Sequence, residues 1–121
     1  MIFKNTLLHL ADNSGPKTAL CLNISKKKIG YLSDILGVVI KKKFLKKKKI
    51  KKNILKGLLI NSKFKFKRKN GFLISFKKNK IVLLNQNLVF LGSNVKAVLC
   101  KEIKKFKKQF KKIISYSAGN V

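Results

Sequence analysis

The chain has 121 residues, 45% of them hydrophobic, and its 31 basic side chains stand against only 3 acidic ones, which leaves a net charge of +28. This length predicts a single domain with one modest core, and a charge of this size predicts a polyanionic partner, nucleic acid first and an anionic membrane surface second. Three carboxylates, one histidine and two cysteines are too few ionisable and ligating groups for an enzyme, a metal site or a bound cofactor to be expected.

The first stretch with candidate site residues is ADNSG, residues 11–15, where Asp12 and Ser14 stand just before the only proline. A carboxylate beside a hydroxyl suits either a catalytic loop or a tight corner between two strands, and the residue types leave both open. Upstream, His9 stands between two leucines, which favours a structural role over metal ligation. The two cysteines stand in apolar stretches and are expected to pack as small core side chains.

Strands are predicted over much of the chain. Residues 20–24 alternate apolar and polar side chains with a period of two, and residues 35–40, 54–60 and 81–84 are apolar runs of strand length. Residues 41–53 are dominated by lysine, with three large apolar side chains interleaved. An ordinary solvated loop is the alternative for this segment, but such a density of lysines favours contact with phosphates.

Residues 62–76 predict a basic hairpin arm. Phe64 and Phe66 share one face of its first strand, and Asn70-Gly71 is a strong hairpin-turn signal because both residues tolerate positive φ. The phenylalanines suit two uses, covering the core or stacking on bases, of which the first is the commoner. The strands together predict an antiparallel β-domain closed so that no edge stays open.

In the C-terminal part of the chain, from about residue 100, the spacing of the apolar residues changes from that of a strand to that of a helix. Ile103, Phe106, Phe110 and Ile113 are spaced three, four and three apart and are surrounded by lysines, which predicts an amphipathic basic helix over residues 100–114. Such a helix can lie on the barrel with its lysines toward solvent or nucleic acid, or adsorb to a membrane surface. No apolar run reaches the roughly 18 residues of a membrane-spanning helix, and the first residues are not built like a leader peptide.

The chain contains three sequence motifs in the same order as the bacterial-type large-subunit ribosomal protein fourteen family, and it resembles that family over its whole length. The first is ADNSG followed by Lys17 and an apolar strand, and the last is KIIS near the end of the chain. The central mark is a small residue, three aliphatics, an Asn-Gly pair, an aromatic, an asparagine and two more aliphatics. Here these are Gly57, Leu58, Leu59, Ile60, Asn70, Gly71, Phe76, Asn79, Val82 and Leu83.

The resemblance implies a mainly β fold: a closed five-stranded antiparallel barrel with a hairpin arm and a small C-terminal helical segment. The chain would be one ribosomal-protein domain, with the barrel over about residues 1–95 and the helical tail over about 96–121. It also implies a structural constituent of the large subunit, without catalysis, that binds large-subunit rRNA near the small-subunit interface. The alternative is a basic amphipathic protein that binds membrane surfaces or polyanions in general.

For the ADNSG corner, the resemblance favours structure over catalysis. Asp12 and Ser14 are then expected to hydrogen-bond nearby backbone N–H groups, while Gly15 takes an unusual φ and Pro16 fixes the next one. For the tail, the resemblance implies a shorter helix over residues 100–107, with residues 112–115 extended along the barrel. Periodicity alone implies one continuous helix, and we favour the shorter one because of the lysine pairs four residues apart and the β-prone isoleucines.

The implied partners are large-subunit rRNA, neighbouring large-subunit proteins and small-subunit rRNA across the interface, and a ribosome-silencing factor is a further partner. In relatives this factor docks at positions that correspond to Ser93, Asn94 and Lys112, with Asn94 in place of an arginine. The rRNA-binding side chains are expected on the basic protrusions and beside the corner: Lys17, Lys46, Lys47, Lys48, Lys49, Lys51, Lys52, Lys67, Arg68 and Lys69.

The compartment is inferred from composition. All basic residues but Arg68 are lysine, although arginine is usually favoured for phosphate recognition. Lysine, asparagine and isoleucine have A- and T-rich codons, so this bias indicates an AT-rich genome. Without a leader, we expect an organelle-encoded protein of the mitochondrial ribosome, with the plastid as the alternative, and the composition also leaves an AT-rich bacterium open.

Overall fold

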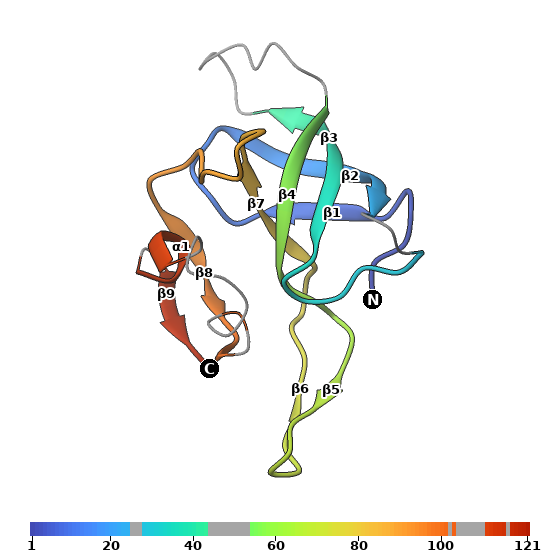
Figure 1. Ribbon diagram of the computed structural model, residues 1–121, viewed down its shortest axis with the longest axis vertical. Coiled ribbons are helices and arrows are strands. Elements are labelled where there is room, and N and C mark those ends of the chain that lie inside the picture. Colours follow the sequence, from blue (N-terminus) through green and yellow to red (C-terminus); the bar gives the residue numbers. More distant parts are fainter. Residues whose placement is uncertain (25–27, 44–53, 102, 104–110, 116) are drawn as a thin grey trace.

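Five strands close into a β-barrel, as the family resemblance implies (Figure 1). The computed structural model describes residues 1–24, 28–43, 54–101, 103, 111–115 and 117–121. Four neighbouring strand pairs are antiparallel, whereas the pair that closes the barrel, β1 with β7, is parallel and sets His9 opposite Lys80. In order around the barrel the strands are β1 (Leu7–Leu10), β2 (Pro16–Ile24), β3 (Ile35–Lys43), β4 (Ile54–Asn61) and β7 (Lys80–Leu84).

The barrel interior holds the first of two apolar clusters, to which all five strands contribute. Consecutive side chains of β4 and β7 are buried. Since successive side chains of a strand point to opposite sides, both faces of these two strands are covered. In β7, Ile81 and Leu83 belong to the interior cluster, whereas Val82 and Leu84 belong to a second cluster on the outer face. Two-sided burial explains the continuous apolar runs at residues 58–60 of β4 and 81–84 of β7. Each fully buried leucine or isoleucine contributes roughly 1.5–3 kcal/mol.

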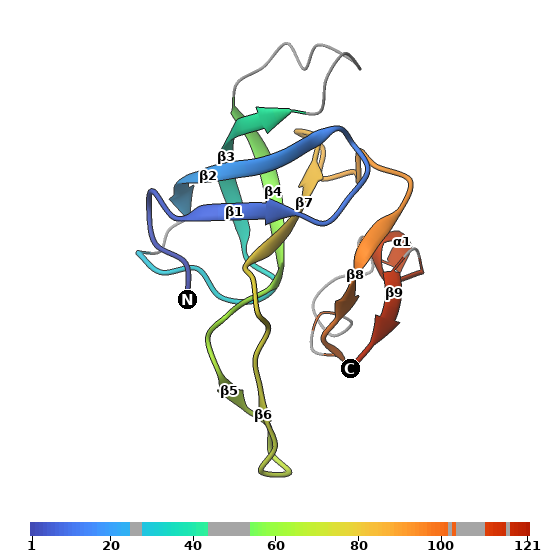
Figure 2. The same ribbon diagram turned by 180° about the vertical axis from the view of Figure 1, so that it is seen from behind.

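The second cluster joins the outer face of β4 and β7 to the end of the chain. Strand β8 (Val95–Leu99) pairs in parallel with β9 (Ser117–Asn120), and the short helix α1 (Lys111–Ser115) precedes β9 (Figure 2). We call β8, α1 and β9 the tail lobe. Val95, Leu99 and Ile113 are at most 1% exposed and fill the space between this lobe and the barrel.

The predicted hairpin arm is present and projects away from the barrel (Figure 1). It consists of β5 (Phe66–Lys67) and β6 (Leu73–Ile74), joined by a turn in which the Gly71 N–H donates to the Arg68 oxygen at 3.0 Å. Only Gly71 of the Asn-Gly pair has positive φ, at 89°. This matches a three-residue loop that ends on a left-handed glycine rather than a two-residue turn.

The aromatic side chains of the arm divide between the two uses considered for them. Phe66 and Phe76 are partly buried and pack against the second cluster. Phe64, which was expected to share the face of Phe66, is 45% exposed. Covering the core is therefore confirmed for Phe66, while Phe64 contributes much less to it.

The tail differs from the expectation drawn from the resemblance. Residues 112–115 were expected to be extended, and this is wrong, because they lie within α1. Ile113 is 1% exposed in the second cluster, and the Ser117 hydroxyl donates to the Ile114 carbonyl oxygen at 2.7 Å at the end of the helix. Burial of Ile113 and this hydrogen bond outweigh the β-propensity of the two isoleucines.

The start of the predicted tail helix is also different. The Ile103 N–H donates to the Cys100 oxygen at 3.2 Å, so the described residues here form a 3₁₀ turn rather than the start of an α-helix. Residues 104–110 of the predicted helix, with Phe106 and Phe110, lie outside the described residues, whereas residues 111–114 are helical, as the periodicity predicts. Ile103 and Ile113 are both buried, as the periodicity predicts.

The two cysteines pack as small core side chains, as predicted. Cys21 belongs to the interior cluster and Cys100 to the second cluster, and both are 0% exposed. Among the described residues, no helix combines the length and the apolar character needed to cross a membrane.

Candidate nucleic-acid interface

The side chain of Asp12 in the ADNSG corner joins this turn to strand β7 by hydrogen bonds. The Asp12 carboxylate accepts hydrogen bonds from the Ser14 hydroxyl at 2.7 Å and, through its other oxygen, from the Leu83 N–H at 2.9 Å. Gly15 has a φ of 121°, as predicted for this turn. The expectation of backbone hydrogen bonds holds for Asp12, whereas the Ser14 hydroxyl donates to Asp12. Both carboxylate oxygens are therefore occupied by structural hydrogen bonds.

Burial affects the ionisation of this carboxyl group. Asp12 is 9% exposed, and its desolvation raises the pKa above the ordinary value of 3.8. The hydrogen bonds from Leu83 and Ser14 oppose that change because they stabilise the charged form. The group is a buried acceptor that organises the corner, not an exposed base.

Asn13 holds the loop that contains two of the expected silencing-factor positions. Its side-chain oxygen accepts the N–H groups of Ser93 and Asn94 at 2.9 and 3.2 Å, and its Nδ2 donates to the Ser93 hydroxyl at 2.8 Å. Ser93 and Asn94 are exposed and lie just before β8. Lys112 lies in α1, whose lysine side chains are outside the described part of the structure.

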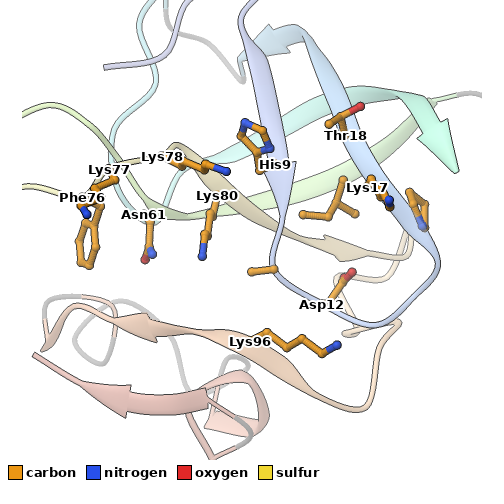
Figure 3. A pocket seen from close by; sticks show the side chains of 13 residues that line it. His9, Asp12, Lys17, Thr18, Asn61, Phe76, Lys77, Lys78, Lys80 and Lys96 are labelled. Atoms are coloured by element: carbon orange, nitrogen blue, oxygen red, sulfur yellow. The ribbon is translucent and has the colours of Figure 1, made fainter. Parts of the chain in front are cut away.

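A basic hollow of about 750 Å³ lies beside the corner (Figure 3). Its wall contains five lysines that come from distant parts of the sequence, together with His9, Asp12 and several neutral residues. In Figure 3, Lys78 extends toward His9, and Lys80 points toward the segment that carries Lys96. Strand β2 supplies Lys17, β7 supplies Lys80, β8 supplies Lys96, and the segment before β7 supplies Lys77 and Lys78.

His9 indicates the sign of the electrostatic potential in the hollow. Partial burial lowers its pKa below the ordinary value of 6.5, and the positive charges of Lys78, Lys63 and Lys80 lower it further. Among the residues that line the hollow, the carboxylate is that of Asp12, whose oxygens already accept hydrogen bonds from Ser14 and Leu83. The hollow therefore favours an anion, and phosphate groups fit its charge and size.

The arm carries a second group of basic residues predicted from the sequence. Lys67 and Lys69 are exposed. Arg68 lies between them and is partly buried, and its guanidinium Nη2 donates to the backbone oxygen of Val121 at 2.6 Å. Arg68 thus joins the arm to the tail lobe, a role that the sequence did not indicate.

The predicted rRNA-binding residues are not all gathered at one place. Lys17 is in the hollow, and Lys67, Arg68 and Lys69 are on the arm. The basic segment with Lys46, Lys47, Lys48, Lys49, Lys51 and Lys52 lies outside the described residues. Sequence reasoning missed four lysines of the hollow, Lys77, Lys78, Lys80 and Lys96. The run FKKNK after the arm was a visible signal for three of them, but Lys96 joins them only through the packing of β8 beside the barrel.

The fold and this surface define a class of small, strongly basic β-barrel protein, and its described residues contain no cluster of three potential metal ligands. The whole chain, residues 1–121, matches the family described as ribosomal protein L14p/L23e, and the chain belongs to that family. It is 38% identical over 120 residues to the large ribosomal subunit protein uL14 of Carsonella ruddii (strain PV), covering 97% of each chain. The chain is therefore a structural, non-enzymatic protein of the large ribosomal subunit.

Proposed function

We propose that this protein binds large-subunit rRNA near the interface with the small subunit, with all 121 residues acting as one domain. The observation that supports it best is the hollow, where lysines from four segments converge around one buried, hydrogen-bonded carboxylate. A cavity of this charge suits the closely spaced phosphates of a bent RNA backbone. The arm lysines Lys67 and Lys69 extend the basic surface away from the barrel.

The mechanism is electrostatic. Lysines that neutralise phosphates release the counterions condensed on RNA, and the rigid barrel holds those lysines in a fixed arrangement. Single lysines do not discriminate between bases, so on this proposal the shape of the folded rRNA selects the site. The segment with Lys46 to Lys49 adds to the same effect through its charge.

The finer partners follow from the family resemblance. We propose neighbouring large-subunit proteins, small-subunit rRNA and a ribosome-silencing factor as partners. The exposed positions Ser93 and Asn94, held by Asn13, offer the factor a fixed loop. Asn94 in place of an arginine removes one charged contact from that proposed site.

The compartment is proposed from composition alone. The lysine bias suits an AT-rich organellar genome, and we propose the mitochondrion first and the plastid as the alternative. A bacterium with an AT-rich genome is a competing source, and one relative of the chain is bacterial. The genomic location of the gene, on an organellar or a bacterial chromosome, decides between them.

Two triple variants test the hollow at equal net charge. Lys77→Gln, Lys78→Gln and Lys80→Gln remove three lysines of the hollow, while Lys4→Gln, Lys28→Gln and Lys41→Gln remove three exposed lysines elsewhere. We expect the first set to reduce the slope of log affinity for rRNA against log salt by roughly 0.7–0.9 for each phosphate that is no longer neutralised, and the second set to change it little. Equal slopes for the two sets would contradict a specific role for the hollow.

A separate experiment tests the ribosomal proposal against the membrane alternative. We expect the full chain to co-sediment with large subunits and to be released by salt. Flotation with anionic lipid vesicles, without co-sedimentation, would contradict the proposal.

Replacement of Lys46, Lys47, Lys48 and Lys49 by glutamine should also reduce the slope of log affinity for rRNA against log salt. An unchanged slope would show that this segment does not contact phosphates.

A further inference from the structure

We propose that Phe72, at the tip of the arm, is a stacking platform for an unpaired RNA base. This inference rests on the proposed rRNA binding and specifies what the arm contacts. It assigns to the arm a contact with the base itself, in addition to the phosphate contacts of its lysines. Aromatic side chains set among basic residues bind single-stranded RNA in this way, because every base offers a π-face.

Exposure distinguishes Phe72 from the other aromatics of the arm. It is 70% exposed, the largest value among the large hydrophobic side chains of the described residues. Phe66 and Phe76 are partly buried against the second cluster and are accounted for by packing. Phe72 makes no such contribution, so its position at the tip requires another explanation.

Three hydrogen bonds hold the backbone around Phe72, and a fourth anchors the arm through the Arg68 side chain. The Arg68 N–H donates to the Phe72 oxygen at 2.9 Å, and the Gly71 N–H donates to the Arg68 oxygen at 3.0 Å. The Phe72 N–H donates to the Asn70 side-chain oxygen at 3.3 Å. Arg68 also anchors the arm to the Val121 backbone oxygen at 2.6 Å. A tip fixed in this way loses little conformational freedom when a base stacks on it.

The charges around the tip favour a nucleotide as the occupant. Lys67 and Lys69 are exposed on either side of Arg68, and the sequence has no carboxylate between Asp34 and Glu102. A base on the Phe72 ring would therefore have cations within reach of its flanking phosphates. An acidic partner surface could use the lysines, but it would leave the ring without a stacking partner.

The strand register argues against a membrane surface. Phe66 lies opposite Ile74 and Lys67 opposite Leu73, so Arg68 and Phe72 share one face of the hairpin. Leu73, which is 63% exposed, therefore points to the opposite face. Insertion into a lipid surface needs apolar side chains on one common face, and the two exposed side chains of the tip do not provide it.

The test uses the absence of tryptophan from the chain. The variant Phe72→Trp places a single indole at the tip, and Leu73→Trp places one on the opposite face as the matched control. Each is titrated with a short uridine oligonucleotide and with an abasic oligonucleotide of the same length, which keeps the phosphates and lacks the bases. We expect the uridine oligonucleotide to quench the emission of Phe72→Trp, the abasic one to leave it unchanged, and Leu73→Trp to respond weakly to both.

Affinity provides the second readout. Phe72→Ala should lower the affinity for the uridine oligonucleotide by about 5- to 100-fold, toward that for the abasic one, while the salt slope stays unchanged. Leu73→Ala should have little effect.

Equal affinity of the native chain for both oligonucleotides, with no effect of Phe72→Ala, would overturn the stacking inference and leave phosphate binding intact. Failure to bind either oligonucleotide or rRNA would overturn the proposed function itself. A blue shift of Phe72→Trp on anionic vesicles, without quenching by RNA, would overturn the inference in favour of a lipid surface.

Discussion

The carboxylate of Asp12 accepts a hydrogen bond of 2.9 Å from the backbone N–H of Leu83, which lies 71 residues later in the sequence. The same corner makes a second contact with β7, where the Ala11 N–H donates to the Ile81 oxygen at 3.0 Å, and one with β8, where the Lys96 N–H donates to the Ala11 oxygen at 2.6 Å. A single turn thus joins β7 of the barrel to β8 of the tail lobe. It also forms one wall of the basic hollow.

Asp12→Asn should therefore lower the free energy of unfolding by about 1–3 kcal/mol, because a neutral amide with one acceptor oxygen replaces a charged carboxylate whose two oxygens both accept hydrogen bonds. Ser14→Ala removes only the hydroxyl that donates to Asp12 and should cost about 1 kcal/mol. Urea denaturation of the two variants measures both values. Loss of translation by assembled particles, at unchanged stability, would instead indicate chemistry at this corner.

His9 should titrate below its ordinary pKa of 6.5, and its titration can be followed by NMR as the one histidine of the chain. Between the folded and the unfolded pKa of His9, the folded state therefore binds fewer protons at this side chain than the unfolded state does. The contribution of His9 to stability is present above pH 6.5 and is lost as the pH falls through the folded pKa.

Lys78→Gln should raise the pKa of His9 toward 6.5 without restoring it fully, since partial burial is the larger cause of the shift. Pyrophosphate in the hollow should also raise it, because an anion offsets the lysine charges. Lys28→Gln is the control, since Lys28 is not among the charges that act on His9. A pKa that does not respond to pyrophosphate would argue against anion binding in the hollow.

Asn13→Ala should release the loop of Ser93 and Asn94 while leaving global stability nearly unchanged, because the three hydrogen bonds it removes are exposed. Faster amide hydrogen exchange at Ser93 and Asn94 is the expected observation. Asn13→Asp keeps an oxygen acceptor for both backbone N–H groups and loses only the donor to the Ser93 hydroxyl, so it should largely preserve protection. Unaltered exchange in Asn13→Ala would show that other contacts hold the loop.

Gly71→Ala should destabilise the arm by about 1 kcal/mol, because φ is 89° there and a side chain strains that conformation. Space is not the cause, since a Cβ at Gly71 would meet no atom within 4 Å. Gly119 has equally open surroundings without a positive φ, so Gly119→Ala is the matched control and should have little effect. Hydrogen exchange at the Arg68 amide, which is bonded across the hairpin, reports the difference.

Local patterns predicted much of the fold. The apolar runs at residues 35–40, 54–60 and 81–84 lie within β3, β4 and β7, and Asn70-Gly71 marks the turn of the arm. Each of these signals depends on a few consecutive residues. Strands β1, β8 and β9 were not predicted, because their short segments become strands through distant partners, β1 beside β7 and β8 beside β9.

Some features of the candidate site could be predicted from the sequence, and others depend on the packing of distant segments. Composition and motifs alone show that the chain is strongly basic, poor in catalytic groups and similar to one ribosomal family, because both can be read from the order of the residues. Only the tertiary structure brought Lys17, Lys80 and Lys96 around one hollow, and only it separated the exposed Phe72 from the packed Phe66. At residues 111–114 the periodicity indicated a helix and the β-prone isoleucines indicated a strand, and burial of Ile113 between lobe and barrel decided for the helix. The hollow and the exposure of Phe72 depend on barrel closure and on packing between segments far apart in the sequence, and no local pattern encodes them.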